Sequence, residues 1–451
     1  MPLESNSARA RGGIDAIIAW LTIWRLLIIL SVVFFCAFGA RTLYGYYTTS
    51  DGMFGKLGYP IGRDYVNIWT AARVTLAGKI NVLPHVTQFH KEQEALLGRP
   101  FPLHNWSYPP HLIPMIVGIG LLPYFAGLAV WLAVTFAAYA TSIAAGRERK
   151  LVPILIALIA PSSYMNCIGG QNGFLTAALL IGGLRLLDRY PIWAGVLFGI
   201  LTIKPQLGLL VPVALLAAGA WRAIAAALVT AGMLVAGSIA LFGTEPWISY
   251  VTEIMPFQRH ILEKGTGLFM YMMPTPFMAA RISGMGIQTG YVLNGATAVL
   301  AVAVVGWCYR NRSIAPDLRI AIFATAVFLA SPYAFNYDLT IATAALIGWL
   351  AFRAAEPQRG IELVVISAMW LLPISVLSPL SVNMTELPYA PIVLVTTLIY
   401  LLARANAFSF VSSRRTPAVE TFRPVLKRCG ATSIAPEPRP NFDLSRELRR
   451  R

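Results

Sequence analysis

Charged side chains are scarce in this sequence: Asp, Glu, Lys and Arg make up only 12% of its 451 residues, whereas 57% of the residues are hydrophobic. The lack of charge excludes an intrinsically disordered chain, and the excess of apolar residues excludes an ordinary soluble domain. The apolar residues gather in segments of the length that membrane-crossing helices need. The composition therefore predicts an all-α polytopic membrane protein.

Cysteines and metal-ligand clusters are also rare. The four cysteines lie far apart and share no spacing: Cys36, Cys167, Cys308 and Cys429. This pattern excludes a disulfide framework and a cysteine metal site, and the acidic residues form no ligand cluster either. The sequence has no Walker loop and no glycine-rich turn after a strand. We therefore expect no metal site, no nucleotide-binding domain and no cofactor.

The positive charge of the chain is unevenly distributed. Its formal net charge is +16, but basic residues are thin in the apolar body and dense after Arg404. Cytoplasmic segments of membrane proteins carry such an excess of Lys and Arg. We interpret the charge as a mark of orientation and of contact with anionic lipids, and we expect no nucleic-acid partner.

Thirteen apolar segments are candidate membrane spans. They lie near residues 26–43, 109–122, 124–145, 151–167, 171–187, 191–203, 205–220, 223–242, 291–309, 319–335, 338–353, 361–378 and 389–404. Arg9 and Arg11 at one end and the basic tail at the other both belong in the cytoplasm, which requires an even number of crossings.

The count of thirteen becomes even if one of these segments does not cross the membrane. Segment 109–122 is short for a span, which needs about 20 residues, and four prolines interrupt or flank it. It is predicted to be a re-entrant or broken half-helix beside a cavity, because irregular backbone at membrane depth has to be received by protein or water. About twelve crossings then remain. Lys204-Pro205 is a second break at which the count changes.

This topology divides the chain into three parts. Residues 1–25 form a cytoplasmic N-terminus with an interfacial segment, and residues 26–405 form the transmembrane domain. Its large outer loops are 44–108, with helices expected over 66–78 and 84–97, and 243–290. Residues 406–451 form a basic, disordered cytoplasmic tail.

Asp64 is the most informative polar residue, because it follows the first span almost at once. A carboxylate at a bilayer surface has to be solvated, paired or used. One interpretation is that Asp64 caps the helix that begins at Tyr65, since Asp is a good N-cap. The other is that it acts as a proton acceptor. The two roles are compatible.

Other polar residues of interest also fall at the outer ends of spans or in the outer loops: Tyr108, His111, Gln171, Asn172, Lys204, Arg259, His260 and Asp338. Together they suit a phosphate-bearing lipid and a polar acceptor. Structural interpretations remain open for several. Lys204 would snorkel to the headgroups or break a helix with Pro205, Gln171 and Asn172 would cap a helix, and Asp338 would pair with Arg281 or with a backbone donor.

The order of four segments supports a family resemblance. "GRDYVNIWTAARVTLAGK", "YPPHLIPMIVGIGLLPYFAGLAVW", "GGQNGFLTAALLIGGLRLLDRYPIWAGVLFGILTIKPQ" and "SPYAFNYDL" follow one another over most of residues 60–350. In this order and spacing they resemble glycosyltransferase family 87 of the GT-C superfamily, which includes polyprenol-phosphate-mannose-dependent mannosyltransferases. The tail after about residue 405 lies outside the resemblance.

The resemblance implies a GT-C-like bundle with juxtamembrane helices in the first periplasmic loop, in a bacterial inner membrane. The donor would be a polyprenyl-phosphate sugar, with mannose the best-known sugar, and the acceptor a glycolipid or glycan hydroxyl. The acidic residue of the first outer loop, here Asp64, would be the base of an inverting single displacement. Lys204, assisted by Arg259, His260 or Arg281, would meet the phosphate. Some GT-C enzymes use a divalent ion, so metal dependence stays open.

The alternative function is a secondary transporter or a flippase of lipid-linked sugars. Transporters usually carry internal repeats and ionisable residues near the bilayer midplane. This sequence shows no convincing repeat, and its charges cluster at the ends of spans. One outer cavity that holds Asp64, Gln171, Lys204 and Asp338 would favour a transferase, and a passage through the midplane would favour transport.

Overall fold

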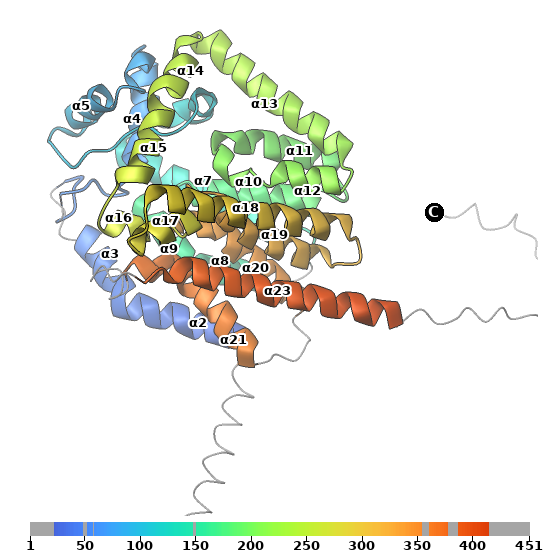
Figure 1. Cartoon of the computed structure of the whole chain (residues 1–451). Coiled ribbons are helices and arrows are strands. Elements are labelled where there is room, and N and C mark those ends of the chain that lie inside the picture. Colours follow the sequence, from blue (N-terminus) through green and yellow to red (C-terminus); the bar gives the residue numbers. More distant parts are fainter. Residues whose placement is uncertain are drawn as a thin grey trace, which may run out of the picture.

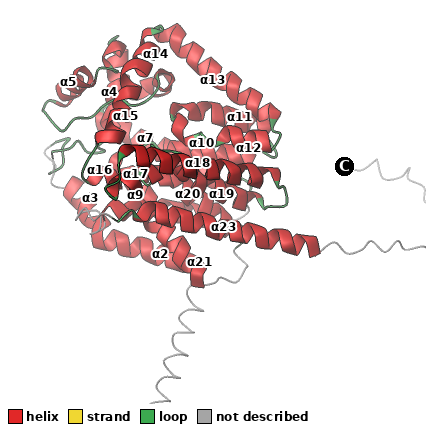
Figure 2. Ribbon diagram, in the orientation of Figure 1, coloured by secondary structure: helices red, strands yellow, loops and turns green. Residues whose placement is uncertain are grey.

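The computed structural model describes residues 22–47, 52–56, 58–147, 150–353, 360–377 and 387–414. Within these ranges the chain is helical, and the only β pairing is an isolated bridge between Phe54 and Pro60 (Figures 1 and 2). The predicted all-α fold is thereby confirmed for the part of the chain that is described. Arg9, Arg11 and the tail beyond residue 414 lie outside it, and the predicted domain limits stay predictions.

Five helices in the described ranges are long and apolar enough to cross a membrane. They cover Ile23–Gly45, Tyr124–Ala144, Trp221–Phe242, Ile287–Arg310 and Gly360–Leu377, and a bent pair adds a sixth candidate. Shorter apolar helices cover Pro110–Leu121, Gly173–Leu186, Pro191–Ile203 and Tyr389–Ala405. A membrane protein is therefore supported, while the number of about twelve crossings stays a prediction.

The centre of the bundle is formed by helices with almost no exposed side chains. In α19 (Pro316–Ala330) every residue from Leu318 to Ala330 is buried, and in α20 (Thr340–Phe352) every residue from Thr340 to Leu350 is buried. Apart from Arg319 near the start of α19 and a few threonines, the buried side chains of these helices are apolar, as expected for core helices. They pack with each other and with α10 (Gly173–Leu186), which in turn packs on α7 (Tyr124–Ala144).

Other helices lie at the periphery and turn apolar side chains outward. In α13 (Trp221–Phe242) Leu228 and Met233 are 70% and 62% exposed, although both are apolar. Such residues suit contact with lipid chains. α13 packs on α11 (Pro191–Ile200), while α18 (Ile287–Arg310) packs on α19 and on α12 (Val211–Ala217).

The first and last described helices form a further layer beside this bundle. The first described helix is continuous through α2 (Ile23–Phe34), the π-helical turn η1 (Phe35–Gly39) and α3 (Ala40–Tyr47). α2 packs on α21 (Gly360–Leu371), which continues into η9 (Leu372–Leu377) and packs on α23 (Tyr389–Arg414). Figure 1 shows these helices side by side below the bundle.

The helices expected over 66–78 and 84–97 are confirmed, whereas the assignment of 44–108 and 243–290 as outer loops stays a prediction. These helices are α4 (Tyr65–Leu76) and α5 (Val86–Leu97), with the short turn η2 (Ile80–Val82) between them. The second outer loop folds into α14 (Glu245–Ser249), η7 (Tyr250–Ile254), α15 (Met255–Lys264), α16 (Leu268–Tyr271) and α17 (Pro276–Ile282). In Figure 1, α14 and α15 lie next to α4 at the same end of the molecule.

Segment 109–122 is broken, as predicted. It consists of η3 (Pro110–Leu112), α6 (Ile113–Ile116) and η4 (Val117–Leu121). Side chains of α4 form hydrogen bonds with this irregular backbone. Trp69 Nε1 donates to the Leu122 carbonyl at 3.0 Å, and Arg73 donates to the Gly120 carbonyl at 3.1 Å. Side chains of the protein thus satisfy carbonyl groups that the short turns leave free.

Two predicted single spans are wrong in detail. Segment 151–167 is divided into α8 (Leu151–Ile159) and α9 (Pro161–Gly169), which meet at 58° because Pro161 begins a new helix. Segment 205–220 contains only a short turn, η6 (Pro205–Leu207), and the seven-residue α12. The chain leaves helical geometry at Lys204, which has φ −141° and ψ 71°, since a following proline disfavours the α conformation.

Candidate active site

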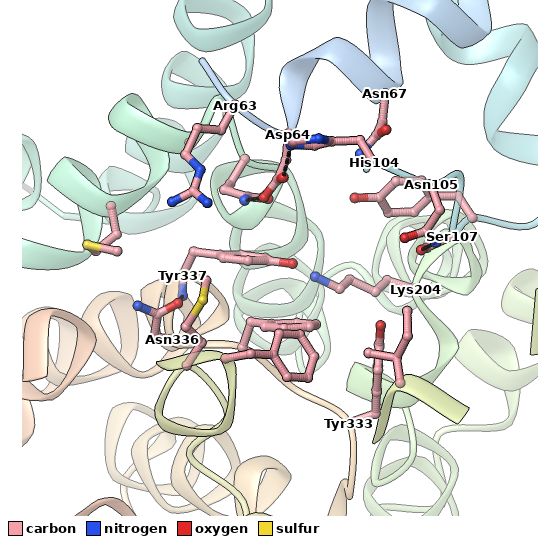
Figure 3. A pocket seen from close by; sticks show the side chains of 18 of the residues that line it. Arg63, Asp64, Asn67, His104, Asn105, Ser107, Lys204, Tyr333, Asn336 and Tyr337 are labelled. Atoms are coloured by element: carbon pink, nitrogen blue, oxygen red, sulfur yellow. Dashed lines mark hydrogen bonds and ion pairs between the residues drawn. The ribbon is translucent and has the colours of Figure 1, made fainter. Parts of the chain in front are cut away.

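A cavity of about 330 Å³ lies among segments that are far apart in the sequence (Figure 3). Four of its walls are the start of α4, the loop 102–108, the turn between α9 and α10, and the Lys204 break together with the loop 333–337, and the segment 250–272 adds Tyr250, Ile261, Phe269 and Met272. Its size suits a small polar ligand or a part of a larger one. Asp64, Tyr108, Gln171 and Lys204, all expected at a site from the sequence, line this one cavity.

The turn that carries Asp64 is fixed against the turn between α9 and α10. The Asp64 N–H donates to the Gly169 carbonyl at 3.1 Å. Gly170 has φ +56°, and a Cβ there would lie 2.7 Å from the Gly62 carbonyl oxygen and 2.5 Å from the Cβ of Tyr65. Only glycine permits both this backbone conformation and this close approach. The contact sets the position of the Asp64 backbone.

The Asp64 side chain points to the cavity and does not cap α4. Asp64 occupies the N-cap position, but its carboxylate makes no capping hydrogen bond. Instead Gln171 Nε2 donates to Oδ2, and His104 Nε2 lies 3.4 Å from Oδ1. The side chain is 39% exposed, and that exposure is to the cavity it lines. The structure therefore excludes the interpretation in which the Asp64 side chain caps α4.

The surroundings of Asp64 favour its ionised form. Burial raises the pKa of this carboxyl, but the hydrogen bond and charge of His104, the charge of Arg63 and the hydrogen bond from Gln171 outweigh burial. The pKa of Asp64 is therefore below its usual value. A carboxylate that stays ionised is able to accept a proton.

His104 is held between a backbone carbonyl and Asp64. Its Nδ1 lies 2.7 Å from the Pro102 carbonyl oxygen, and its Nε2 lies on the side of Asp64 Oδ1. Both neighbours are hydrogen-bond acceptors, and the two contacts fix the orientation of the imidazole ring. The sequence analysis did not single out His104 as a site residue, although it stands four residues before Tyr108.

Lys204 forms a buried ion pair. Its ammonium group lies 2.6 Å from Asp338 Oδ1, and the two side chains are 4% and 0% exposed. It also donates to Asn172 Oδ1 at 3.2 Å and lies 4.6 Å from the centre of the Tyr337 ring. Lys204 therefore does not snorkel to the headgroups. Asp338 pairs with it, and its Oδ2 accepts the Phe335 N–H at 3.0 Å, so the expected backbone donor is present. Arg281 does not pair with Asp338 and donates to two backbone carbonyls instead.

The polar and aromatic groups that complete the lining suit a carbohydrate. Neither Gln171 nor Asn172 caps a helix through its side chain; Gln171 binds Asp64 and Asn172 binds Lys204. Burial, and then the negative charges of Asp64 and Asp338, raise the pKa of the Tyr108 phenol, which stays protonated and able to donate. Further lining residues not singled out from the sequence are Arg63, Asn67, Asn105, Tyr333, Asn336 and Tyr337.

Five expected residues do not line the cavity: Asn172 and Asp338 contact it only through Lys204, and His111, Arg259 and His260 lie away from it. His111 is buried, bonds Thr202 Oγ1 at 3.2 Å and stacks on Trp247. Arg259 and His260 are exposed on α15, and Arg259 pairs with Glu263 at 2.7 Å. Ile261 is the residue of α15 that lines the cavity, and the helical period turns its two neighbours away.

The described residues contain no group of three or more His, Cys, Asp or Glu that could hold a metal ion. The expectation of no cofactor stays a prediction, and metal dependence stays open.

Comparison with known proteins gives one match. The family model for glycosyltransferase family 87 matches residues 106–332, which is half of the chain. The matched range includes Tyr108, Gln171 and Lys204, begins after Asp64 and ends before Asp338. No curated protein and no solved structure matches the chain.

Proposed function

The chain belongs to glycosyltransferase family 87 and is thus a membrane glycosyltransferase, and from this premise we propose its donor, acceptor and mechanism. The donor is a polyprenyl-phosphate hexose, with mannose as the first candidate. The acceptor is a hydroxyl group of a glycolipid or glycan on the periplasmic side of a bacterial inner membrane. The bilayer delivers the lipid-linked substrate.

The position and charge of Asp64 carry this proposal. Its carboxylate faces the cavity and is held ionised, so it accepts the proton of the acceptor hydroxyl. The acceptor oxygen then forms a bond to the anomeric carbon while the bond from that carbon to the phosphate oxygen breaks. The electron pair of the broken bond remains on the phosphate. One displacement of this kind inverts the anomeric carbon.

The groups around Asp64 suit supporting roles. Gln171 and His104 each donate to one carboxylate oxygen, which fixes the orientation of the base and leaves lone pairs free to accept a proton. Lys204 uses two of its three donors on Asp338 and Asn172 and keeps one for a substrate oxygen. The phenols of Tyr108 and Tyr333 add neutral donors for sugar hydroxyls or for phosphate.

The same geometry favours a transferase over a transporter or flippase. Asp64, Gln171 and Lys204 share one cavity, and Asp338 is bonded to Lys204 at its wall. A transporter site would instead place ionisable residues at the interface of two repeats near the bilayer midplane.

The test uses membranes that contain the full-length chain and a labelled polyprenyl-phosphate mannose. We expect transfer of label to a membrane acceptor, and a loss of about 100-fold or more in Asp64→Asn and Asp64→Ala, because general-base catalysis contributes that much. Glu92→Gln, which removes an acidic group elsewhere on the same outer loop, serves as the control. Normal transfer by Asp64→Asn would overturn the assignment of the base, and loss of the protein itself would indicate a structural role.

A further inference from the structure

One guanidinium at the cavity has no ion-pair partner. The arginine and lysine side chains among the described lining residues are Arg63 and Lys204. Lys204 is paired with Asp338. The guanidinium of Arg63 forms neither an ion pair nor a hydrogen bond with any side chain or carbonyl of the described residues, so its N–H groups are available to a ligand.

An aromatic contact holds the guanidinium of Arg63 in place and leaves its N–H groups available. It stacks on the ring of Tyr59, with its central carbon 4.4 Å from the ring centre. Stacking engages the face of a guanidinium and leaves its N–H edge free for an anion. Figure 3 shows the group pointing into the pocket, with Lys204 on the other side of Asp64.

The backbone of Arg63 is also unusual. Its φ is +29°, which makes it the one non-glycine residue with positive φ in the described part of the chain. A side chain in such a conformation costs on the order of 1–3 kcal/mol. Strain of this kind gathers where a side chain has to be aimed at a ligand, and glycine would avoid it here.

We propose that Arg63 binds the phosphate of the lipid-linked donor, an inference that rests on the proposed function. The phosphate that joins a sugar to a polyprenyl chain carries one negative charge, and Arg63 is a cation of the cavity lining that forms no ion pair with a carboxylate of the described residues. A guanidinium binds two phosphate oxygens at once. When the bond to the sugar breaks, the phosphate gains a second negative charge, and Arg63 stabilises it. Lys204, whose charge Asp338 balances, contributes a hydrogen bond without net charge.

The test measures binding, so that it does not depend on turnover. The purified full-length protein in detergent is titrated with radiolabelled farnesyl phosphate and, as the matched ligand without phosphate, farnesol. The variant Arg63→Gly removes the side chain and relieves the backbone, which protects against misfolding. Lys79→Gln, which removes an exposed charge of the same outer loop, is the control.

We expect Arg63→Gly to weaken farnesyl phosphate binding by about 10- to 100-fold, the effect of a lost charge-assisted hydrogen bond. Farnesol binding should not change, Arg63→Lys should retain part of the affinity, and added guanidinium should restore part of it in Arg63→Gly. Equal binding of farnesyl phosphate by wild type and Arg63→Gly would overturn the inference. So would an equal loss for farnesol, or displacement by inorganic phosphate at the same concentration.

Failure of the proposed function has a different signature. If the wild-type protein binds farnesyl phosphate through Arg63 but transfers no sugar from any polyprenyl-phosphate donor, the phosphate site stands and the reaction is wrong. If the wild type transfers sugar and Arg63→Gly has an unchanged donor KM, the reaction stands and the role of Arg63 is wrong.

Discussion

The carboxylate of Asp64 lies under two opposing influences. Burial disfavours its charge, whereas His104, Arg63 and Gln171 favour it, and the second set prevails. The contribution of His104 is the largest of those that lower the pKa. The charge of the base therefore depends on a residue that stands forty positions away in the sequence.

This dependence predicts a shift in the pH profile of the reaction. A base with a lowered pKa stays ionised, and the enzyme active, down to a pH below about 4, the usual value for Asp. In His104→Phe the largest favourable contribution is lost while burial remains, so the pKa of Asp64 should rise. The acid limb of kcat/KM for sugar transfer should then move to higher pH. A limb that does not move, at a reduced rate, would show that His104 only shapes the loop.

The residues of the site were accessible to prediction where their role depends on local position. Asp64, Gln171 and Lys204 stand at the ends of apolar segments, and ends on one side of a membrane meet. The sequence could not predict which face of a short helix points to the cavity. Arg259 and His260 lie on such a helix, and contacts of the fold decide which of its side chains point inward. His104 lies in a loop without periodicity, so its approach to Asp64 could not be derived.

Between elements, the contact of two turns determines whether the site is assembled. The turn before α4 and the turn between α9 and α10 touch at Gly62 and Gly170, and the Asp64 N–H bonds across them. A side chain at position 170 meets backbone, which cannot move away as a flexible side chain would.

We therefore expect Gly170→Ala to lower both stability and activity. Gly146 provides a matched control, because it has a φ of +71° but open space around its Cβ position. Gly146→Ala should cost only the backbone strain of about 1 kcal/mol, and Gly170→Ala should cost more by the overlap. Thermal unfolding in detergent measures the difference, and transfer assays should show loss of activity in Gly170→Ala alone. Equal effects of both substitutions would mean that the two turns do not depend on this contact.

The elements themselves were predictable where the pattern was strong and unbroken. The helices of the first outer loop appear as α4 and α5 within two residues of their expected starts. The bend at Pro161 was missed because the segment 151–167 was read as one span, although Ser162, Ser163 and Asn166 follow the proline. The segment after Lys204 is equally apolar, yet its chain forms short turns, since hydropathy reports burial and not helix length.

At the scale of the molecule, several arginine ion pairs lie at the helix ends away from the cavity. Arg147 and Arg185 bind Asp317 at 2.6 and 2.9 Å, and Arg319 binds Asp188, all at helix ends away from the cavity. Arg222 lies at the start of α13, whose 22 residues span about 33 Å, and the other end of α13 leads to the loop that covers the cavity. Basic residues gather on the cytoplasmic side of a membrane protein, so the cavity should face the periplasm.

Cysteine labelling tests this orientation. Lys79→Cys places a thiol on the outer loop beside α4, and Arg222→Cys places one at the far end of α13, both at exposed positions. In cells with a permeable outer membrane, a maleimide that cannot cross the inner membrane should label Lys79→Cys at once and Arg222→Cys only after lysis. The unsubstituted chain reports any labelling of its own cysteines. The reverse pattern would place Asp64 on the cytoplasmic side, where a periplasmic acceptor could not reach it. Such a result would contradict both the predicted topology and the proposed reaction.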